Sequence, residues 1–367
     1  MNKKKLRRVL LAYSSRPPIM DYLESAFGAA GVEVHKVYLD QNTAFDRIVI
    51  HYVNKYLHSL RLMPKSQNLF QAHPLAHRNF RSEALLDAAR QFQPELTLLI
   101  RGISVRQDVL EAVREMAPLM AWWVEKEERV EEAIREIDLF DWYFFMNSSC
   151  VERAAELEKR HTSLLVHAVD PGCFYRMPEI GKKHDICFVG NWSLKRQRFL
   201  EQVLQTTSNI AIYGGKWKKK CWQNPKLWRC IKGSYIDGEA LVRLYNESRI
   251  VLNVTNWGFG EGMNRSGVNM RVLEVPATGA FLLTDDSRDL RAYFEPGKQL
   301  AVYADLADCL QQIRFYLAHP QQREAIAAAG EMLVREAYTY RQIVEQVLQA
   351  YQKIDQPVLP EAEVVAV

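Results

Sequence analysis

The fold is decided by the residues from Asp185 to Gly214, DICFVGNWSLKRQRFLEQVLQTTSNIAIYG. Two short apolar runs, DICFVG and NIAIYG, flank a charged stretch from Lys195 to Leu204 that has a helical pattern. Continuous apolar runs of this length are typical of strands that are buried on both faces of a parallel sheet. The segment therefore predicts a β-α-β unit, in which a helix connects two neighbouring parallel strands.

The same alternation recurs along the whole chain. Further apolar runs begin at Val9, Leu96, Leu119, Trp142, Leu164, Arg249, Ala280 and Leu300. Strands that alternate with helices in this way favour an α/β fold with two Rossmann-like halves. After the last run, helical patterns cover Asp305 to Ala318, Gln321 to Ala337 and Thr339 to Ile354.

The chain has 367 residues, which is too long for one ordinary hydrophobic core. The segment DPGCFYRMPEIGKKHD, Asp170 to Asp185, has two prolines, two glycines and little periodicity, and is the best linker. The predicted organisation is a first domain over 1–170, a linker over 171–184, a second domain over 185–337, a final helix over 338–354 and a flexible tail over 355–367.

The charge pattern is mildly basic, with a net charge of +4 and local runs at Lys3 to Arg8 and Lys216 to Lys220. Such a field suits phosphate-bearing ligands or an anionic membrane surface and does not indicate nucleic acid, although ordinary solvated faces are the alternative. The segment from Ile48 to Phe80 is basic and rich in His, Tyr and Leu, and is read as a surface helix, or one that lies over a cleft or on a membrane.

No apolar run approaches the roughly 18 to 20 residues that cross a bilayer, and no signal-peptide core follows the first basic residues. We therefore expect a cytoplasmic protein, with peripheral contact to the inner face of the membrane through the basic segments. The six cysteines form no C-x-x-C pair, so we expect reduced and mostly buried thiols.

Candidate ligand-binding residues follow the predicted strands, where open α/β sheets bind their ligands. Gly190 after the first strand of the second half would allow a phosphate to approach the backbone, and Lys195 or Arg196 would supply positive charge. Gly214 repeats the pattern after the next strand. A plain strand-to-helix turn with solvated basic residues is the alternative, because a single glycine is weaker than a full G-x-G-x-x-G motif.

A long polar segment, NVTNWGFGEGMNRSGVNMRVLEV, runs from Asn253 to Val275. It is too long and polar for a mere connection, which favours ligand binding. Arg271 and Glu274 stand one helical turn apart, so they form either a surface salt bridge or a pair in which the arginine binds a phosphate and the glutamate accepts from the hydroxyls of a ribose. Asn253, Arg265 and Asn269 are further donor-binding candidates.

The chain contains no D-x-D triplet. A Mg²⁺ or Mn²⁺ site that holds a nucleotide diphosphate through aspartates is therefore not expected, and neither a cofactor nor a metal is predicted. Arginine, lysine and helix N-termini would then stabilise a departing diphosphate.

The residues from Asn269 to Gln342 resemble the carboxyl-terminal domain of the CgeB and YkvP-like glycosyltransferases, through NMRVLEVPATGAFLLTDD, FEPGK, YLAHP and REAIA. The likeness continues upstream through DICFVG, IYGGKW and HAVDPGCFYRMP. It implies a GT-B architecture, in which two Rossmann-like domains face a central cleft and a final helix crosses back to the first domain. It also implies that Glu274 binds the ribose, that Arg271 precedes it, and that Gly279 is the turn glycine. All three residues are donor-binding candidates.

The chain departs from that pattern at Ser266, where retaining relatives often have a first glutamate. Either Glu261 is displaced into this role or the carboxylate is absent, so the stereochemical course stays open. Glu125 and Glu127, after the Trp-Trp strand, are candidate catalytic bases, with solvated charges at a helix start as the alternative.

The predicted function is the metal-independent transfer of a sugar from a nucleotide donor to a cell-envelope polysaccharide or to a lipid-linked or protein-linked glycan. The alternatives are a non-catalytic binder of nucleotide sugars or glycans on the same fold, and less readily a nucleotide-sugar epimerase.

Overall fold

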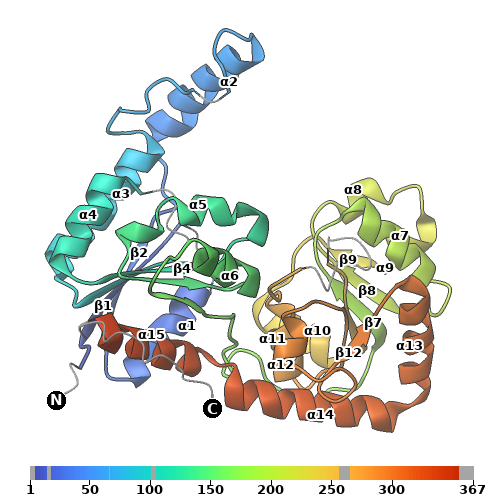
Figure 1. Cartoon of the computed structure of the whole chain (residues 1–367). Coiled ribbons are helices and arrows are strands. Elements are labelled where there is room, and N and C mark those ends of the chain that lie inside the picture. The colour runs from blue at the N-terminus through green and yellow to red at the C-terminus, as the bar shows by residue number, and fades with distance from the viewer. Residues whose placement is uncertain (1–4, 15–17, 66, 101–104, 256–264, 355–367) are drawn as a thin grey trace. The chain divides into compact units, whose positions relative to one another are not determined.

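The computed structural model describes residues 5–14, 18–65, 67–100, 105–255 and 265–354 (Figure 1). The chain divides into two compact units. Unit 1 comprises 1–146, 150–165 and the C-terminal part from Val344, and unit 2 comprises 147–149 and 166–343. The first crossing from unit 1 to the main part of unit 2 therefore falls at Val166, four residues before the predicted end of the first domain.

Unit 1 is built on a parallel sheet with the described strand order β2-β1-β3-β4-β5-β6. The central strands are apolar along their whole length because helices cover both faces of such a sheet. Trp122 and Trp123 are fully buried, and the Trp122 indole donates a hydrogen bond of 2.8 Å to the Leu165 carbonyl. The strands are β1 (Arg8–Tyr13), β2 (Glu33–Tyr38), β3 (Leu96–Ile100), β4 (Leu119–Trp123), β5 (Trp142–Phe145) and β6 (Thr162–Leu164).

Helices of unit 1 pack their apolar faces on this sheet, whereas α2 extends away from it (Figure 1). In Figure 1, α2 projects from the sheet, whereas α1, α4 and α15 lie along it. The helices are α1 (Ile19–Ala29), a π-helical turn η1 (Asp46–Ile50), α2 (His51–Ser59), α3 (His77–Phe92), α4 (Gln107–Met116), η2 (Glu127–Arg129), α5 (Val130–Ile134), η3 (Ile137–Leu139), α6 (Ser148–Glu156) and α15 (Tyr340–Ile354), which joins unit 1 from Val344 onward.

Unit 2 is built on a second parallel sheet with the described order β12-β11-β10-β7-β8-β9. The chain starts this sheet at β7, extends it through β8 and β9 on one side, and then returns to β10 on the other side. The strand order therefore reverses between β7 and β10. The strands are β7 (His184–Val189), β8 (Ile210–Tyr213), β9 (Ile231–Gly233), β10 (Ser248–Asn253), β11 (Leu282–Asp285) and β12 (Ala301–Tyr303).

The helices of unit 2 connect these strands and close the core on both faces of the sheet. They are α7 (Leu194–Val203), α8 (Trp217–Lys220), α9 (Pro225–Cys230), α10 (Gly238–Asn246), α11 (Arg271–Ala277), α12 (Leu290–Tyr293), α13 (Leu306–Ala318) and α14 (Pro320–Ala337). The three C-terminal helical patterns are confirmed as α13, α14 and α15, and Val347 and Tyr351 of α15 are buried as its periodicity predicts.

Some features differ from the sequence expectation. The apolar run at Leu164 is mostly not a strand, because β6 ends there and Val169 forms only an isolated bridge with Thr339. The basic run at Lys216 continues into regular structure, since the segment from Lys216 to Lys232 forms α8, α9 and most of β9. All six cysteines are free and all but Cys173 are buried, as expected. Within the described part of the chain, no helix is long and apolar enough to span a bilayer.

Candidate functional site

The carboxyl ends of β7 and β10 are where an open parallel sheet of this strand order commonly binds a ligand. In open parallel sheets, the helices that follow two adjacent strands leave on opposite faces where the strand order reverses, and this opens a crevice. The predicted residues Gly190 and Asn253 lie at these two strand ends. Helix α7 begins directly after β7, and its first-turn N–H groups carry the positive end of the helix dipole.

Asn253 links the end of β10 to two other elements. Its amide nitrogen donates to the Thr284 hydroxyl at 2.9 Å, and its amide oxygen accepts from Arg271 at 2.7 Å. Asn253 is almost fully buried, so both bonds are protected from water. The network places the Arg271 guanidinium, at the start of α11, beside the carboxyl end of β10.

Basic residues of α7 reach the same strand end. Arg196 donates to the carbonyls of Val254 at 2.8 Å and Asn191 at 2.9 Å, and Lys195 donates to the Thr255 carbonyl at 3.0 Å. Asp285, at the end of β11, accepts from both the backbone and the hydroxyl of Thr255. The structure therefore brings Lys195, Arg196 and Arg271 together around the end of β10. The sequence had placed these residues only after separate strands.

The electrostatics of this cluster favour an anion. Burial, with the nearby Arg271 as a second cause, lowers the pKa of Arg196 to about 10. Among the described residues neither arginine forms an ion pair, because their partners are carbonyl and amide oxygens. Burial also raises the pKa of Asp285, so that carboxyl compensates the cations only partly. A bound diphosphate would supply the missing negative charge.

Glu274 lies one turn after Arg271 in α11 and is partly buried. Burial raises the pKa of its carboxyl to about 7, and the opposing effect of Arg271 is smaller. The two side chains are thus close enough to interact electrostatically but are not an ion pair within 4 Å. The surface salt bridge that was the alternative for this pair is not present.

The glycines of the site serve backbone packing. A Cβ on Gly214 would lie 2.0 Å from the Gly190 carbonyl oxygen, so the ends of β7 and β8 approach closely only because Gly214 has no side chain. That same carbonyl accepts a 2.7 Å hydrogen bond from the indole of Trp217. Gly190 and Gly214 therefore have a packing role. Their contact with a phosphate stays a prediction.

Gly279 is a turn glycine, as the resemblance implied. It follows the C-terminus of α11, at the opposite end of the helix from Arg271, with a positive φ of 65°. Its N–H bonds to Pro276 and the N–H of Ala280 to Val275, which is the Schellman pattern that favours glycine. Gly279 therefore ends α11 near the amino edge of the sheet, and its contact with the donor stays a prediction.

The polar segment before α11 is described only in part. Glu261 lies outside the described residues. Asn269 accepts from the Arg271 backbone N–H at 3.1 Å and so helps to start α11. Ser266 is buried with its hydroxyl bonded to that of Ser149, and the backbone oxygen of Arg265 accepts from Arg288 at 3.2 Å.

The two candidate bases lie in unit 1, after β4. Glu125 forms an ion pair of 3.0 Å with Arg129, and only 15% of its side chain is exposed. Glu127 begins the short turn η2. Within the described ranges, no group of three or more His, Cys, Asp and Glu residues is arranged to hold a metal ion.

Sequence reasoning missed three residues of this region: Thr255, Asp285 and Asp289. Asp289 is buried and accepts from the backbone N–H groups of Ser148 and Gly267. Short polar residues after strands are common in loops, and only the TDD run after β11 offered a signal.

Part of the chain matches a known protein family. Residues 195–349 match the family model described as glycosyl transferase-like. The chain is 23% identical over 264 residues to the spore protein CgeB of Bacillus subtilis, a match that covers 69% of this chain and 81% of CgeB.

The chain is similar to CgeB, and its residues 195–349 are glycosyl transferase-like. Its fold is the GT-B fold of solved structures. HepE of Anabaena, in complex with UDP-glucose, has a TM-score of 0.63 at 12% identity, with 95% of this chain and 100% of HepE covered. The sucrose-phosphate synthase of Thermosynechococcus elongatus has a TM-score of 0.67 at 13% identity, with 95% and 99% covered. These structural matches confirm the predicted α/β fold class, the GT-B fold.

Proposed function

We propose that this glycosyltransferase takes its sugar from a nucleotide-sugar donor that binds unit 2 at the carboxyl ends of β7 and β10. The observation that carries the proposal is the pair Arg196 and Arg271. The two like charges lie close enough for one to lower the pKa of the other, and no described carboxylate is ion-paired with either. A diphosphate would relieve this repulsion and accept hydrogen bonds from α7.

The remaining donor contacts follow from α11. Glu274 would accept from the ribose hydroxyls as a carboxylate, and its raised pKa would make donor binding stronger as pH rises through 7. A solved structure of the same fold, HepE, is in complex with UDP-glucose, which supports a nucleotide sugar as donor. We propose that arginine, lysine and the start of α7 stabilise the departing diphosphate without a metal.

For the acceptor we propose a cell-envelope polysaccharide or a lipid-linked or protein-linked glycan, with Glu125 or Glu127 as the base. Loss of turnover in only one of the variants Glu125→Gln and Glu127→Gln, with donor binding unchanged, would identify the base. Peripheral contact with an anionic membrane surface also stays a proposal. It is supported by Tyr52 and Tyr56, exposed by 52% and 66% on the projecting α2.

The test is calorimetric titration of the intact chain with UDP-, GDP-, dTDP- and CMP-linked sugars. We expect one nucleotide class to bind, and Arg271→Gln to weaken it about tenfold or more because a charge-assisted hydrogen bond is lost. Arg243→Gln is the matched control, since Arg243 is a half-exposed residue of α10. Absence of binding by every donor, or equal affinity of Arg271→Gln and wild type, would refute the proposal.

A further inference from the structure

One segment of unit 1 has an unusual charge pattern. Residues 47 to 82 contain no aspartate or glutamate, although 44 of the 367 residues of the chain are acidic. The same 36 residues contain six lysines and arginines and four of the nine histidines. The segment cannot neutralise its own positive charge, so it attracts anions.

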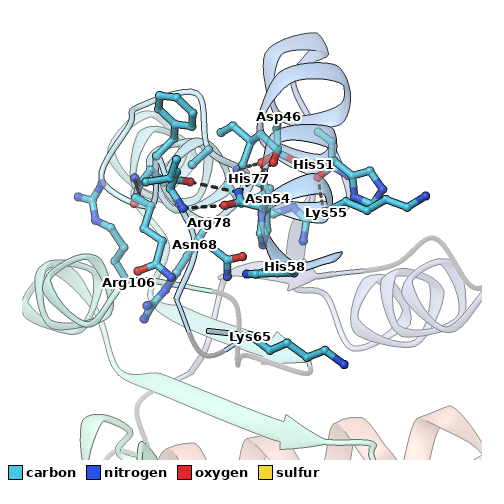
Figure 2. Close-up of a pocket in the computed structure, with 18 of the residues that line it drawn as sticks. Asp46, His51, Asn54, Lys55, His58, Lys65, Asn68, His77, Arg78 and Arg106 are labelled. Carbon is cyan, nitrogen blue, oxygen red and sulfur yellow. Dashed lines mark hydrogen bonds and ion pairs between the residues drawn. The ribbon is translucent and has the colours of Figure 1, made fainter. Parts of the chain in front are cut away.

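This segment folds around a cavity of about 1040 Å³, which we call the α2–α3 pocket. Figure 2 shows that its lining comes from α2, from the connection between α2 and α3, and from the start of α3, with Arg106 at its lower side. All lining residues belong to unit 1. The volume suits a ligand of the size of a mono- or disaccharide derivative better than a single ion.

The lining of the α2–α3 pocket carries an excess of positive charge. Asp46 is its one carboxylate, and this group accepts from the backbone N–H of His77 at 3.0 Å. Lys55 and Lys65 form no ion pair with any carboxylate of the described residues. Both side chains are therefore available to an anion.

Two arginines add to this charge from α3. Arg78 is exposed and donates to the Val105 carbonyl at 3.3 Å, and it also interacts electrostatically with Glu136. Arg81 is bound to oxygens of the segment 40–42, and burial lowers its pKa. A phosphate group offers several acceptor oxygens and up to two negative charges, and so can pair with more than one of these donors.

The wall of the α2–α3 pocket is held in place before any ligand binds. The Asn54 amide donates to the carbonyls of Ile50 at 2.9 Å and Leu69 at 3.2 Å and accepts from the Leu69 N–H at 2.7 Å. These bonds tie α2 to the connection that follows it. Preformed walls reduce the entropy lost on binding.

One side of the lining is apolar. This side is lined by Ile50, Leu69 and Phe70. Phe70 is 41% exposed, and its ring packs edge-on against that of Phe45, with 6.0 Å between the ring centroids. Sugar rings carry C–H faces that pack on such surfaces, whereas a bare phosphate ion does not need one. Cationic and apolar walls together fit a sugar that bears a phosphate.

We propose that the α2–α3 pocket is a second ligand site, which binds a phosphate-bearing sugar through Lys65 and Arg78. The site lies in unit 1 and uses none of the donor-site residues of unit 2. Binding is measured without turnover, so the proposal does not depend on the donor assignment.

The probe is glucose 6-phosphate, with inorganic phosphate and glucose beside it, titrated into the intact chain. We expect glucose 6-phosphate to bind more tightly than either. The double variant Lys65→Gln with Arg78→Gln is expected to weaken it at least about tenfold, because two charged partners are lost. Lys5→Gln with Arg90→Gln is the matched control, since both residues are exposed in unit 1 outside the pocket and Arg90 is also in α3. Unchanged thermal melting shows that each variant is folded.

Three results would overturn the proposal. One is the absence of glucose 6-phosphate binding at millimolar concentration. Another is equal affinity of the pocket variant and its control for glucose 6-phosphate. The third is loss of glucose 6-phosphate binding in Arg271→Gln, which would show that the ligand binds at the donor site. Phosphatidylglycerol vesicles form a separate arm. If they bind the wild type but not the pocket variant, while glucose 6-phosphate does not bind, the phosphate belongs to a lipid headgroup and the soluble sugar phosphate is excluded.

Discussion

Glu274 is expected to reduce the stability of unit 2 at neutral and higher pH. The perturbation that tests this is Glu274→Gln, which keeps the shape of the side chain and removes its charge. Burial raises the pKa of the carboxyl from 4.5 to about 7, so the folded chain holds this proton more tightly than the unfolded chain does. Below about pH 4.5 both states are protonated and the group has no effect. Above about pH 7 both are ionised and the folded state bears the full cost of the buried charge.

The size of the effect follows from that shift. Each pKa unit corresponds to about 1.4 kcal/mol, so a rise from 4.5 to about 7 gives a ceiling of roughly 3 kcal/mol. Glu274 is only partly buried and water screens part of its charge. We therefore expect Glu274→Gln to raise the free energy of unfolding by about 1 to 2 kcal/mol at pH 8, and by close to zero at pH 4.5.

The assay is urea unfolding at several pH values between 4.5 and 8.5, together with titration of the nucleotide-sugar donor. The wild type should lose stability as pH rises through this window, and the variant should lose less. Glu136→Gln is the matched control, because burial also raises the pKa of Glu136 to about 7 but Glu136 lies in unit 1. Two transitions, one for each unit, would separate the two effects.

Donor affinity should change in the opposite direction. If Glu274 accepts from a ribose, Glu274→Gln should stabilise the free chain and weaken its affinity for the donor about tenfold. Such a trade-off is typical of residues that bind a ligand at a cost in stability. Parallel pH profiles of stability for variant and wild type would refute the reasoning on the buried charge. A stabilised variant with unchanged donor affinity would refute the ribose role alone.

Two further predictions concern packing around glycines and a buried tryptophan. A Cβ on Gly330 of α14 would lie 2.2 Å from the Gln299 carbonyl oxygen, so Gly330→Ala should lower the free energy of unfolding by about 2 kcal/mol. Gly28→Ala in α1, where nothing lies within 4 Å, should raise it by about 0.5 kcal/mol, and urea unfolding that ranks the pair otherwise would contradict this. Trp217→Phe removes the 2.7 Å hydrogen bond from the indole to the Gly190 carbonyl and leaves a gap. Thermal unfolding should show that the free energy of unfolding falls by about 2 kcal/mol. An unchanged free energy of unfolding would show that water replaces the indole.

Much of the fold was readable from local pattern. Central strands such as β3 and β4 are buried on both faces and therefore appear as continuous apolar runs. The edge strands β2 and β9 were not recognised. Strand β2 mixes exposed and half-buried residues, and β9 has only three residues, so neither produces such a run.

The candidate site was predictable only to the level of strand ends. Gly190, Lys195 and Asn253 were found because they follow apolar runs, and parallel strands end at one edge of a sheet. The sequence identified Gly279 as a turn glycine, but a glycine after a helix has the same local sequence whether it only ends the helix or also contacts a ligand. Its positive φ and Schellman bonds are properties of the backbone conformation.

The sequence by itself determined the alternation of strands and helices, the acid-free segment and the carboxylate at Glu274, because each depends on neighbours in the chain. The tertiary structure decided that Arg196 and Arg271, on separate helices, share one buried environment, and that Asp46, Lys65 and Arg78 line one cavity. Burial and the distance between charges depend on groups far apart in the chain. Only the fold therefore fixes the pKa of Glu274 and the charge balance of the α2–α3 pocket.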